Sequence, residues 1–211
     1  MAANILLLIN QLFFLYIILS NYSAYIIINI IEKTYFALKY FIIMLYLIGF
    51  MGVGKTTIGK QLSKQYNISL IDTDEKIKNK YKTSITEIFK NNGENIFRKI
   101  EADILRDIPK KKLVSCGGGL PSYKNNMKFI NQTGFSIYLK ASKNELFNRI
   151  STNDNKRPLI QNKTKKELKF FIEKTLADRE KFYLMADYTI DTTNLSINEV
   201  LTKINALRIP I

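Results

Sequence analysis

A glycine-rich stretch at residues 49–57 carries the clearest chemical signal in the sequence. It reads GFMGVGKTT and fits the pattern G-x-x-x-x-G-K-T, whose glycines let the backbone come close to a ligand. In this pattern successive backbone N–H groups bind phosphate oxygens, the lysine reaches the terminal phosphates and the threonine hydroxyl ligates Mg²⁺. The sequence therefore predicts a nucleotide site, with Thr56 as a metal ligand, formed by Gly52, Val53, Gly54, Lys55, Thr56 and Thr57.

The residues on either side place this motif between a strand and a helix. Residues 45–48 are an apolar run suited to a buried strand, and Ile58, Leu62 and Tyr66 recur at helical spacing. A helix that starts at the loop adds a positive partial charge where phosphate binds. The alternative, a glycine turn followed by a solvated lysine, does not explain the flanking strand and helix.

Two further polar signals follow expected strands. Asp72 and Asp74 come directly after residues 68–71, and Gly117 to Gly119 follow residues 113–116. Side chains at the carboxyl ends of parallel strands point into the ligand crevice, and alternation directs both aspartates the same way if the strand continues that far. The alternatives are that the aspartates cap the next helix and that the glycines form a plain flexible loop.

Strands and helices alternate along the chain, which favours an α/β fold. We expect three layers, α/β/α, around a five-stranded parallel sheet of the P-loop kinase type. The polar, Asn-rich segment at about 151–165 interrupts this order and is typical of a mobile lid. The expected strands are 45–48, 68–71, 113–116, 135–139 and 188–190, and the expected helices are 58–66, 75–81, 85–91, 94–108, 143–150, 165–186 and one that begins near 197.

Composition excludes several classes of protein. The chain has 211 residues and no histidine, so Ser-His-Asp and Cys-His catalysis and histidine metal sites are excluded. Its single cysteine, Cys116, cannot form an internal disulfide and is expected to be a small buried residue. The net charge is +14, but the lysines are scattered along the chain, so we expect no nucleic-acid partner.

Residues 1–43 form a hydrophobic N-terminal extension whose only charges are Glu32, Lys33 and Lys39. Three interpretations stay open: a membrane anchor, a targeting segment of unusual composition, or a mis-assigned start. In the last, which we favour, Met44 begins the protein and leads directly into the first strand. The domain is then residues 44–211, and only residues 1–43 offer a membrane contact.

Taken in order and spacing, the motifs closely resemble the shikimate kinase family over residues 45–208. The series runs from the phosphate-binding loop to a late arginine that is followed four residues on by a tyrosine. Its members are the loop at 49–57, Asp72-Thr73-Asp74, Phe97-Arg98-Lys99-Ile100-Glu101, Gly117-Gly118-Gly119, Arg157-Pro158-Leu159, and Arg179 with Tyr183.

The resemblance implies that the γ-phosphate of ATP is transferred to the 3-hydroxyl of shikimate. It implies ATP as co-substrate, one Mg²⁺ per subunit held by Thr56 and Asp72, a monomer and a cytoplasmic enzyme. Asp74 binds the acceptor hydroxyls, and Lys55 and Arg157 complete the catalytic set. Arg98 and Arg179 clamp the substrate carboxylate, Gly118 offers backbone contacts, and Arg157 also contacts ATP from the lid.

The placement of arginine supports these assignments. Only six of the 32 basic residues are arginines, and three of them are Arg98, Arg157 and Arg179. A planar guanidinium binds carboxylate and phosphate bidentately, which lysine does not. The alternative is that each forms a surface ion pair. One departure from the family is that residues 193–196 lack the arginine that commonly packs on adenine.

Two rival functions stay open at this point. One is another small-molecule kinase with a phosphate-binding loop, such as a gluconate-type enzyme. The other is a non-catalytic nucleotide-binding module tethered to a membrane by residues 1–43. The paired aspartates, Arg98 and the triple glycine favour a small hydroxylated carboxylate as the acceptor.

Overall fold

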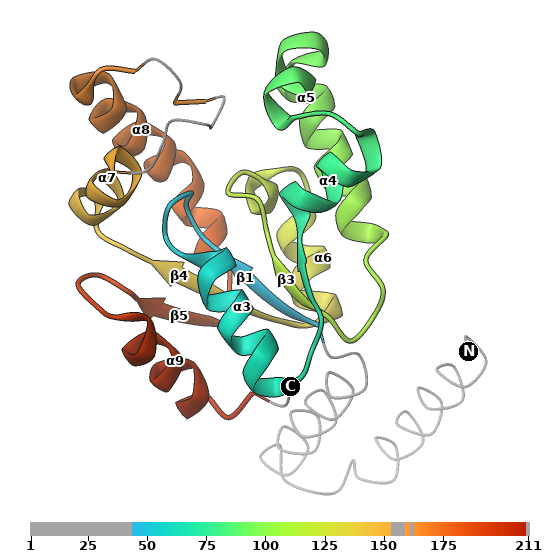
Figure 1. Cartoon of the computed structure of the whole chain (residues 1–211), viewed down its shortest axis with the longest axis vertical. Coiled ribbons are helices and arrows are strands. Elements are labelled where there is room, and N and C mark those ends of the chain that lie inside the picture. The colour runs from blue at the N-terminus through green and yellow to red at the C-terminus, as the bar shows by residue number, and fades with distance from the viewer. Residues whose placement is uncertain (1–43, 153–158, 161–162, 210–211) are drawn as a thin grey trace, which may run out of the picture. The chain divides into compact units, whose positions relative to one another are not determined.

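A computed structural model describes residues 44–152, 159–160 and 163–209 (Figure 1). The predictions for the extension at residues 1–43, for Arg157 and for most of the lid therefore lie outside the described residues. Within them the chain forms a five-stranded sheet of order β2-β3-β1-β4-β5. Every pair of neighbouring strands is parallel, which confirms the predicted sheet. The strands are β1 (Leu45–Ile48), β2 (Leu70–Asp72), β3 (Leu113–Ser115), β4 (Phe135–Lys140) and β5 (Tyr188–Asp191).

Helices cover both faces of this sheet (Figure 1). Helices α3 and α9 lie against one face and α6 lies on the other. The arrangement confirms the expected three layers. The helices are α3 (Lys55–Tyr66), α4 (Thr73–Tyr81), α5 (Ile85–Arg106), α6 (Asn126–Thr133), α7 (Lys143–Ser151), α8 (Lys165–Tyr183) and α9 (Ile197–Ala206), with a short 3₁₀ helix η2 (Leu120–Ser122).

Strand β1 lies at the centre of the sheet. Its four residues are fully buried, because β3 and β4 pair with it on either side and helices cover both faces. A strand buried on both faces is apolar along its whole length, which is why residues 45–48 form a continuous apolar run. The phosphate-binding loop follows this strand directly, so the most buried part of the core fixes where the loop begins.

Several boundaries differ from those expected. Strand β2 begins at Leu70 instead of residue 68 and ends at Asp72, where the side chain caps helix α4. Helix α6 and η2 were not predicted, because residues 120–134 mix polar and apolar residues without a clear start signal. Helix α8 ends at Tyr183, three residues earlier than expected. Capping boxes at Ser84, Thr164 and Ser196 begin helices α5, α8 and α9.

Helix α5 breaks at Gly93, between the helices expected at 85–91 and 94–108. Gly93 has φ 76° and ψ 171°, so the backbone changes direction between two helical segments. A small second core, formed by Ile77, Ile88, Phe97 and Ile104, joins α4 to both segments of α5. This packing fixes the second segment, which carries Arg98 and Glu101.

Candidate active site

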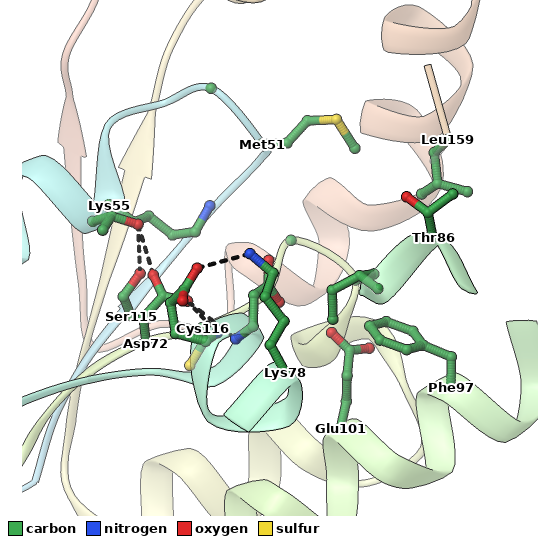
Figure 2. Close-up of a pocket in the computed structure, with 18 of the residues that line it drawn as sticks. Met51, Lys55, Asp72, Lys78, Thr86, Phe97, Glu101, Ser115, Cys116 and Leu159 are labelled. Atoms are coloured by element: carbon green, nitrogen blue, oxygen red, sulfur yellow. Dashed lines mark hydrogen bonds and ion pairs between the residues drawn. The ribbon is translucent and has the colours of Figure 1, made fainter. Parts of the chain in front are cut away.

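The predicted site residues gather around one cavity of about 850 Å³ near the carboxyl ends of β1, β2 and β3. Figure 2 shows Lys55, Asp72 and Ser115 on one side of it and Phe97 and Glu101 on the other. Val53 does not line the cavity because its side chain is buried in the core, and Arg157 lies outside the described residues. The predicted residues that do line it are Gly52, Gly54, Lys55, Thr56, Thr57, Asp72, Asp74, Arg98, Gly118 and Arg179.

The phosphate-binding loop has the backbone that its glycines allow. Gly52 and Gly54 have φ of 79° and 103°, values that residues with side chains rarely adopt, and α3 begins immediately afterwards at Lys55. The Lys55 ammonium donates to the carbonyl oxygens of Gly49 and Phe50, at 2.8 Å each. The lysine is therefore held against the loop and faces the cavity, where phosphate would bind.

Three oxygen-bearing side chains meet beside this loop. The Thr56 hydroxyl donates to Oδ2 of Asp72 at 2.7 Å and lies 3.4 Å from the hydroxyl of Ser115. Hydroxyl and carboxylate oxygens are ligands that Mg²⁺ prefers, and this ion usually keeps several waters and phosphate oxygens as its other ligands. The donor set thus fits Mg²⁺, although no cluster of three or more His, Cys, Asp or Glu ligands occurs in the part of the chain described. Sequence reasoning missed Ser115, whose signal is its place at the end of β3.

Asp72 has a second role at the start of α4. Its Oδ1 accepts hydrogen bonds from the backbone N–H groups of Asp74 (3.0 Å) and Glu75 (3.4 Å). Asp72 therefore both caps helix α4 and lines the cavity. Asp74 reaches the cavity from the first turn of α4, because β2 ends at Asp72 and the condition for strand alternation is not met. The strand ends at Asp72 because its side chain nucleates the helix.

Arg98 is fixed between two acidic residues of its own helix. Its guanidinium binds Glu94 at 2.8 Å and Glu101 at 2.5 Å, and it lies 5.4 Å from the centre of the Phe97 ring. Burial raises the pKa of Glu101 to about 7, with Arg98 opposing and Asp74 adding to the shift. The Arg98–Glu101 pair thus sets the direction of a cation that faces the cavity.

The triple glycine runs between these charged groups. The backbone N–H of Gly117 donates to the Thr73 hydroxyl at 2.8 Å, a contact that the sequence did not suggest. A Cβ atom on Gly117 would lie 2.4 Å from Oε1 of Glu101, and one on Gly119 would lie 2.3 Å from Cζ of Arg98. The glycines therefore leave room for the charged side chains of the site, in addition to any approach by a ligand.

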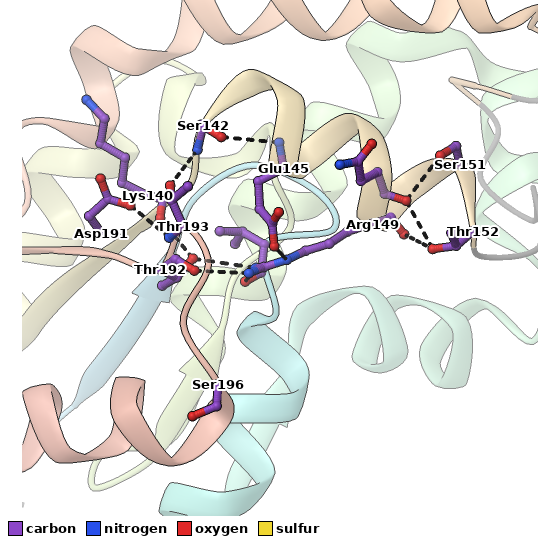
Figure 3. Close-up of polar contacts among 12 residues, drawn as sticks. Lys140, Ser142, Glu145, Arg149, Ser151, Thr152, Asp191, Thr192, Thr193 and Ser196 are labelled. Atoms are coloured by element: carbon purple, nitrogen blue, oxygen red, sulfur yellow. Dashed lines mark hydrogen bonds and ion pairs between the residues drawn. The ribbon is translucent and has the colours of Figure 1, made fainter.

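Arg149 occupies the region behind the phosphate-binding loop (Figure 3). Its guanidinium donates to the carbonyl oxygens of Val53 (3.2 Å) and Thr192 (3.0 Å), and to Glu145 (2.7 Å). A guanidinium from α7 is thus present beside the segment that lacks the arginine common in the family. Sequence reasoning missed it, and the only signal was that arginine is scarce in this chain.

Fold and site together define a class of protein. A phosphate-binding loop on a parallel sheet, facing an aspartate and two arginines across one cavity, is the arrangement of a P-loop kinase that acts on a small anionic alcohol. Comparison with known sequences narrows this class. The profile of the shikimate kinase family matches residues 51–207, and the chain belongs to that family.

Known relatives and solved structures agree with this assignment. A shikimate kinase of Azobacteroides pseudotrichonymphae is 42% identical over 160 residues, which are 74% of this chain and 94% of that protein. A shikimate kinase of Parabacteroides distasonis is 38% identical, over 71% of this chain and 88% of that protein.

Two crystal structures share the fold. Shikimate kinase of Bacteroides thetaiotaomicron has a TM-score of 0.74 and 31% identity, over 79% of this chain and 98% of that chain. Shikimate kinase of Acinetobacter baumannii in complex with shikimate has a TM-score of 0.72 and 30% identity, over 78% and 92%. Among the residues that the structure describes here, none of the helices has the length and apolar character needed to cross a membrane.

Proposed function

We propose that this enzyme transfers the γ-phosphate of ATP to the 3-hydroxyl of shikimate, giving shikimate 3-phosphate and ADP on the route to chorismate and the aromatic amino acids. Membership of the family supports this, and one observation carries it. A single cavity places Lys55 and Thr56 together with Asp74, Arg98 and Arg179. These are the groups that a triphosphate and a hydroxylated carboxylate require.

The nucleotide end of the cavity is the phosphate-binding loop. Residues 52–57 would hold the triphosphate through backbone N–H groups, and the Lys55 ammonium would neutralise charge on the terminal phosphates. Thr56 and Asp72 would hold Mg²⁺, with Ser115 close to them. A Mg²⁺ ion held there would supply positive charge that offsets the negative charge of the phosphate groups.

The acceptor end is formed by α4, α5, α8 and the glycine loop. Asp74 would orient the attacking hydroxyl and accept its proton as the new P–O bond forms and ADP leaves. Arg98 and Arg179 would bind the carboxylate, since two planar guanidinium groups fix both the charge and the direction of a carboxylate. Gly118 would offer backbone contacts to the ring.

The lid residue Arg157 completes the proposed catalytic set. Because it lies outside the described residues, its closing over the transferring phosphate stays a prediction from the sequence. Leu159, two residues further on, does line the cavity. A monomeric state and a cytoplasmic location also stay predictions.

The rival functions are less well supported. A gluconate-type acceptor would also use a carboxylate clamp, but the relatives and crystal structures described above are shikimate kinases. A binding-only module has no physical need for a buried Arg98–Glu101 pair or for Asp74 beside the phosphate-binding loop.

A coupled assay of ADP release tests the proposal. Shikimate, gluconate and CMP are offered side by side with ATP and Mg²⁺, and we expect turnover with shikimate alone. Asp74→Asn should lower kcat at least about a hundredfold while ATP binding, measured by calorimetry, is unchanged. A clear preference for gluconate or CMP would remove the assignment, and unchanged turnover in the Asn variant would remove Asp74 from the mechanism.

A further inference from the structure

Tyr183 is the last residue of α8 and is fully buried next to the proposed acceptor site. It follows Arg179 by four residues, so both side chains project from the same face of the helix. Its hydroxyl donates a hydrogen bond to the carbonyl oxygen of Gly118, the central residue of the glycine loop.

The charge of Arg179 also acts on this hydroxyl. Burial raises the pKa of Tyr183 to about 12, while the charge of Arg179 and a hydrogen bond with it act in the opposite direction. A phenol both donates and accepts, so the hydroxyl that donates to the Gly118 carbonyl keeps lone pairs for a nearby N–H. Nη1 of Arg179 also lies 3.8 Å from the place of a Cβ on Gly118.

The position of the hydroxyl is set by the protein core. The Tyr183 ring packs against the ring of Tyr138 in β4, with 5.1 Å between the ring centres. At the other end, the place of a Cβ on Gly118 lies 3.3 Å from the backbone nitrogen of Met51, so the glycine loop touches the phosphate-binding loop. The phenol therefore connects α8 and the glycine loop from a rigid base.

We propose that Tyr183 is a positioning residue for the acceptor, which holds the Gly118 carbonyl and the Arg179 guanidinium in the arrangement that binds shikimate. The inference rests on the function proposed above and extends it to a residue that need not touch the reacting atoms. Without the hydroxyl, the Gly118 carbonyl loses a donor and the Arg179 guanidinium loses a polar neighbour. The contacts that Gly118 and Arg179 would make with shikimate then become less well ordered, while the phosphate-binding loop keeps its own hydrogen bonds.

Tyr183→Phe tests this in the full chain, with Tyr138→Phe as the matched control. Tyr138 is the other ring of the pair, and burial together with the charge of Glu180 raises the pKa of its hydroxyl. We expect Tyr183→Phe to raise the KM for shikimate about tenfold, the size of one or two lost hydrogen bonds, with KM for ATP changed less than about twofold. Tyr138→Phe should lower Tm by a similar amount but leave the KM for shikimate and the KM for ATP unchanged.

Two further measurements separate positioning from stability. Arg179→Lys and the double variant complete a cycle, and coupled residues should show clearly less than additive effects on shikimate KM. Replacing Tyr183 by 4-aminophenylalanine keeps an N–H donor at the same place. The KM for shikimate should then lie between the values of the wild type and the Phe variant. If the Phe variant does not fold, the 4-aminophenylalanine variant is assayed in its place. It should raise the KM for shikimate by a smaller factor and again leave the KM for ATP nearly unchanged.

The outcomes distinguish this inference from the proposed function. A wild-type protein that does not phosphorylate shikimate overturns the proposed function and this inference with it. An active wild type whose Tyr183→Phe variant keeps its shikimate KM, or loses affinity for ATP and shikimate equally, overturns the inference alone.

Discussion

At positions 117 and 119, charged side chains come so close to the backbone that only glycine fits without displacing them. Gly117 lies against Glu101 and Asp74, and Gly119 lies against the guanidinium of Arg98. A methyl group at either position would overlap with atoms that are themselves held by ion pairs and hydrogen bonds. The triple glycine is therefore explained by the side chains of the protein as well as by its expected ligand.

Gly119→Ala should displace Arg98 while leaving the fold intact. The backbone of Gly119 has φ −94° and ψ −14°, which alanine adopts without strain, but its Cβ would lie 2.3 Å from Cζ of Arg98. We expect the KM for shikimate to rise at least about tenfold, because the carboxylate clamp loses its geometry. Steady-state kinetics check this, with an unchanged KM for ATP as the internal control. An unaltered KM for shikimate would show that Arg98 does not bind the acceptor.

Glu101 should make stability depend on pH in a defined direction. Its pKa is raised from 4.5 to about 7 in the folded protein, chiefly by burial. Between these values the folded chain keeps a proton that the unfolded chain has released, so this group's contribution falls as pH rises from about 4.5 to 7.

The isosteric Glu101→Gln variant isolates that contribution, because glutamine is neutral throughout. Urea unfolding at pH 5 and pH 8 should show the wild type losing stability relative to the variant, by on the order of 3 kcal/mol if the full shift is expressed. A difference between the two proteins that does not change with pH would mean that the pKa of Glu101 is not raised.

At the scale of elements, the start of α4 joins folding to the site. One oxygen of Asp72 caps the helix and the other accepts from Thr56. The helix then carries Asp74 in its first turn. The break at Gly93 in α5 likewise lets the second segment, with Arg98 and Glu101, face the cavity while both segments pack on α4.

Two substitutions at Asp72 separate these roles. Asparagine keeps a capping oxygen but loses the charge, whereas alanine loses both. We expect both variants to lose most of kcat, and only Asp72→Ala to lose about 1 kcal/mol of stability in addition. Activity assays at several Mg²⁺ concentrations and urea unfolding measure the two effects. Wild-type turnover in Asp72→Asn would exclude a role for the charge.

At the scale of the whole molecule, Met44 and Leu45 are hydrogen-bonded into the sheet. The carbonyl oxygen of Met44 accepts from the N–H of Phe135 at 2.9 Å, and the N–H of Leu45 donates to Lys112 at 3.0 Å. Met44 and Leu45 are both buried in the main core. The relatives match about three-quarters of this chain at nearly their full length.

A chain of residues 44–211 should therefore keep the kcat and shikimate KM of the full chain within about twofold. A chain that begins at Leu47 is the matched control. It loses both hydrogen bonds and half of the central strand, so it should not fold. Circular dichroism and the ADP assay measure the two outcomes. Loss of activity in the 44–211 chain would show that residues 1–43 contribute to the enzyme.

Much of this molecule is determined by local sequence. The phosphate-binding loop, the capping boxes and the central apolar strand each depend on a few consecutive residues, because backbone conformation and burial on both faces restrict which residues fit. The parallel sheet follows from the alternation of strands and helices. The proposed roles of Arg98, Arg179 and Gly118 come from the family resemblance, which depends on motif order.

Only the tertiary structure decided which distant residues meet. Ser115 lies beside Thr56, Thr73 binds Gly117, Arg149 reaches Val53, and Tyr183 binds Gly118. Each contact joins different segments of the chain, and side chains that meet across a sheet edge leave no periodic pattern in sequence. The end of β2 at Asp72 was decided in the same way, since a strand residue that also caps a helix obeys neither strand alternation nor helical spacing alone.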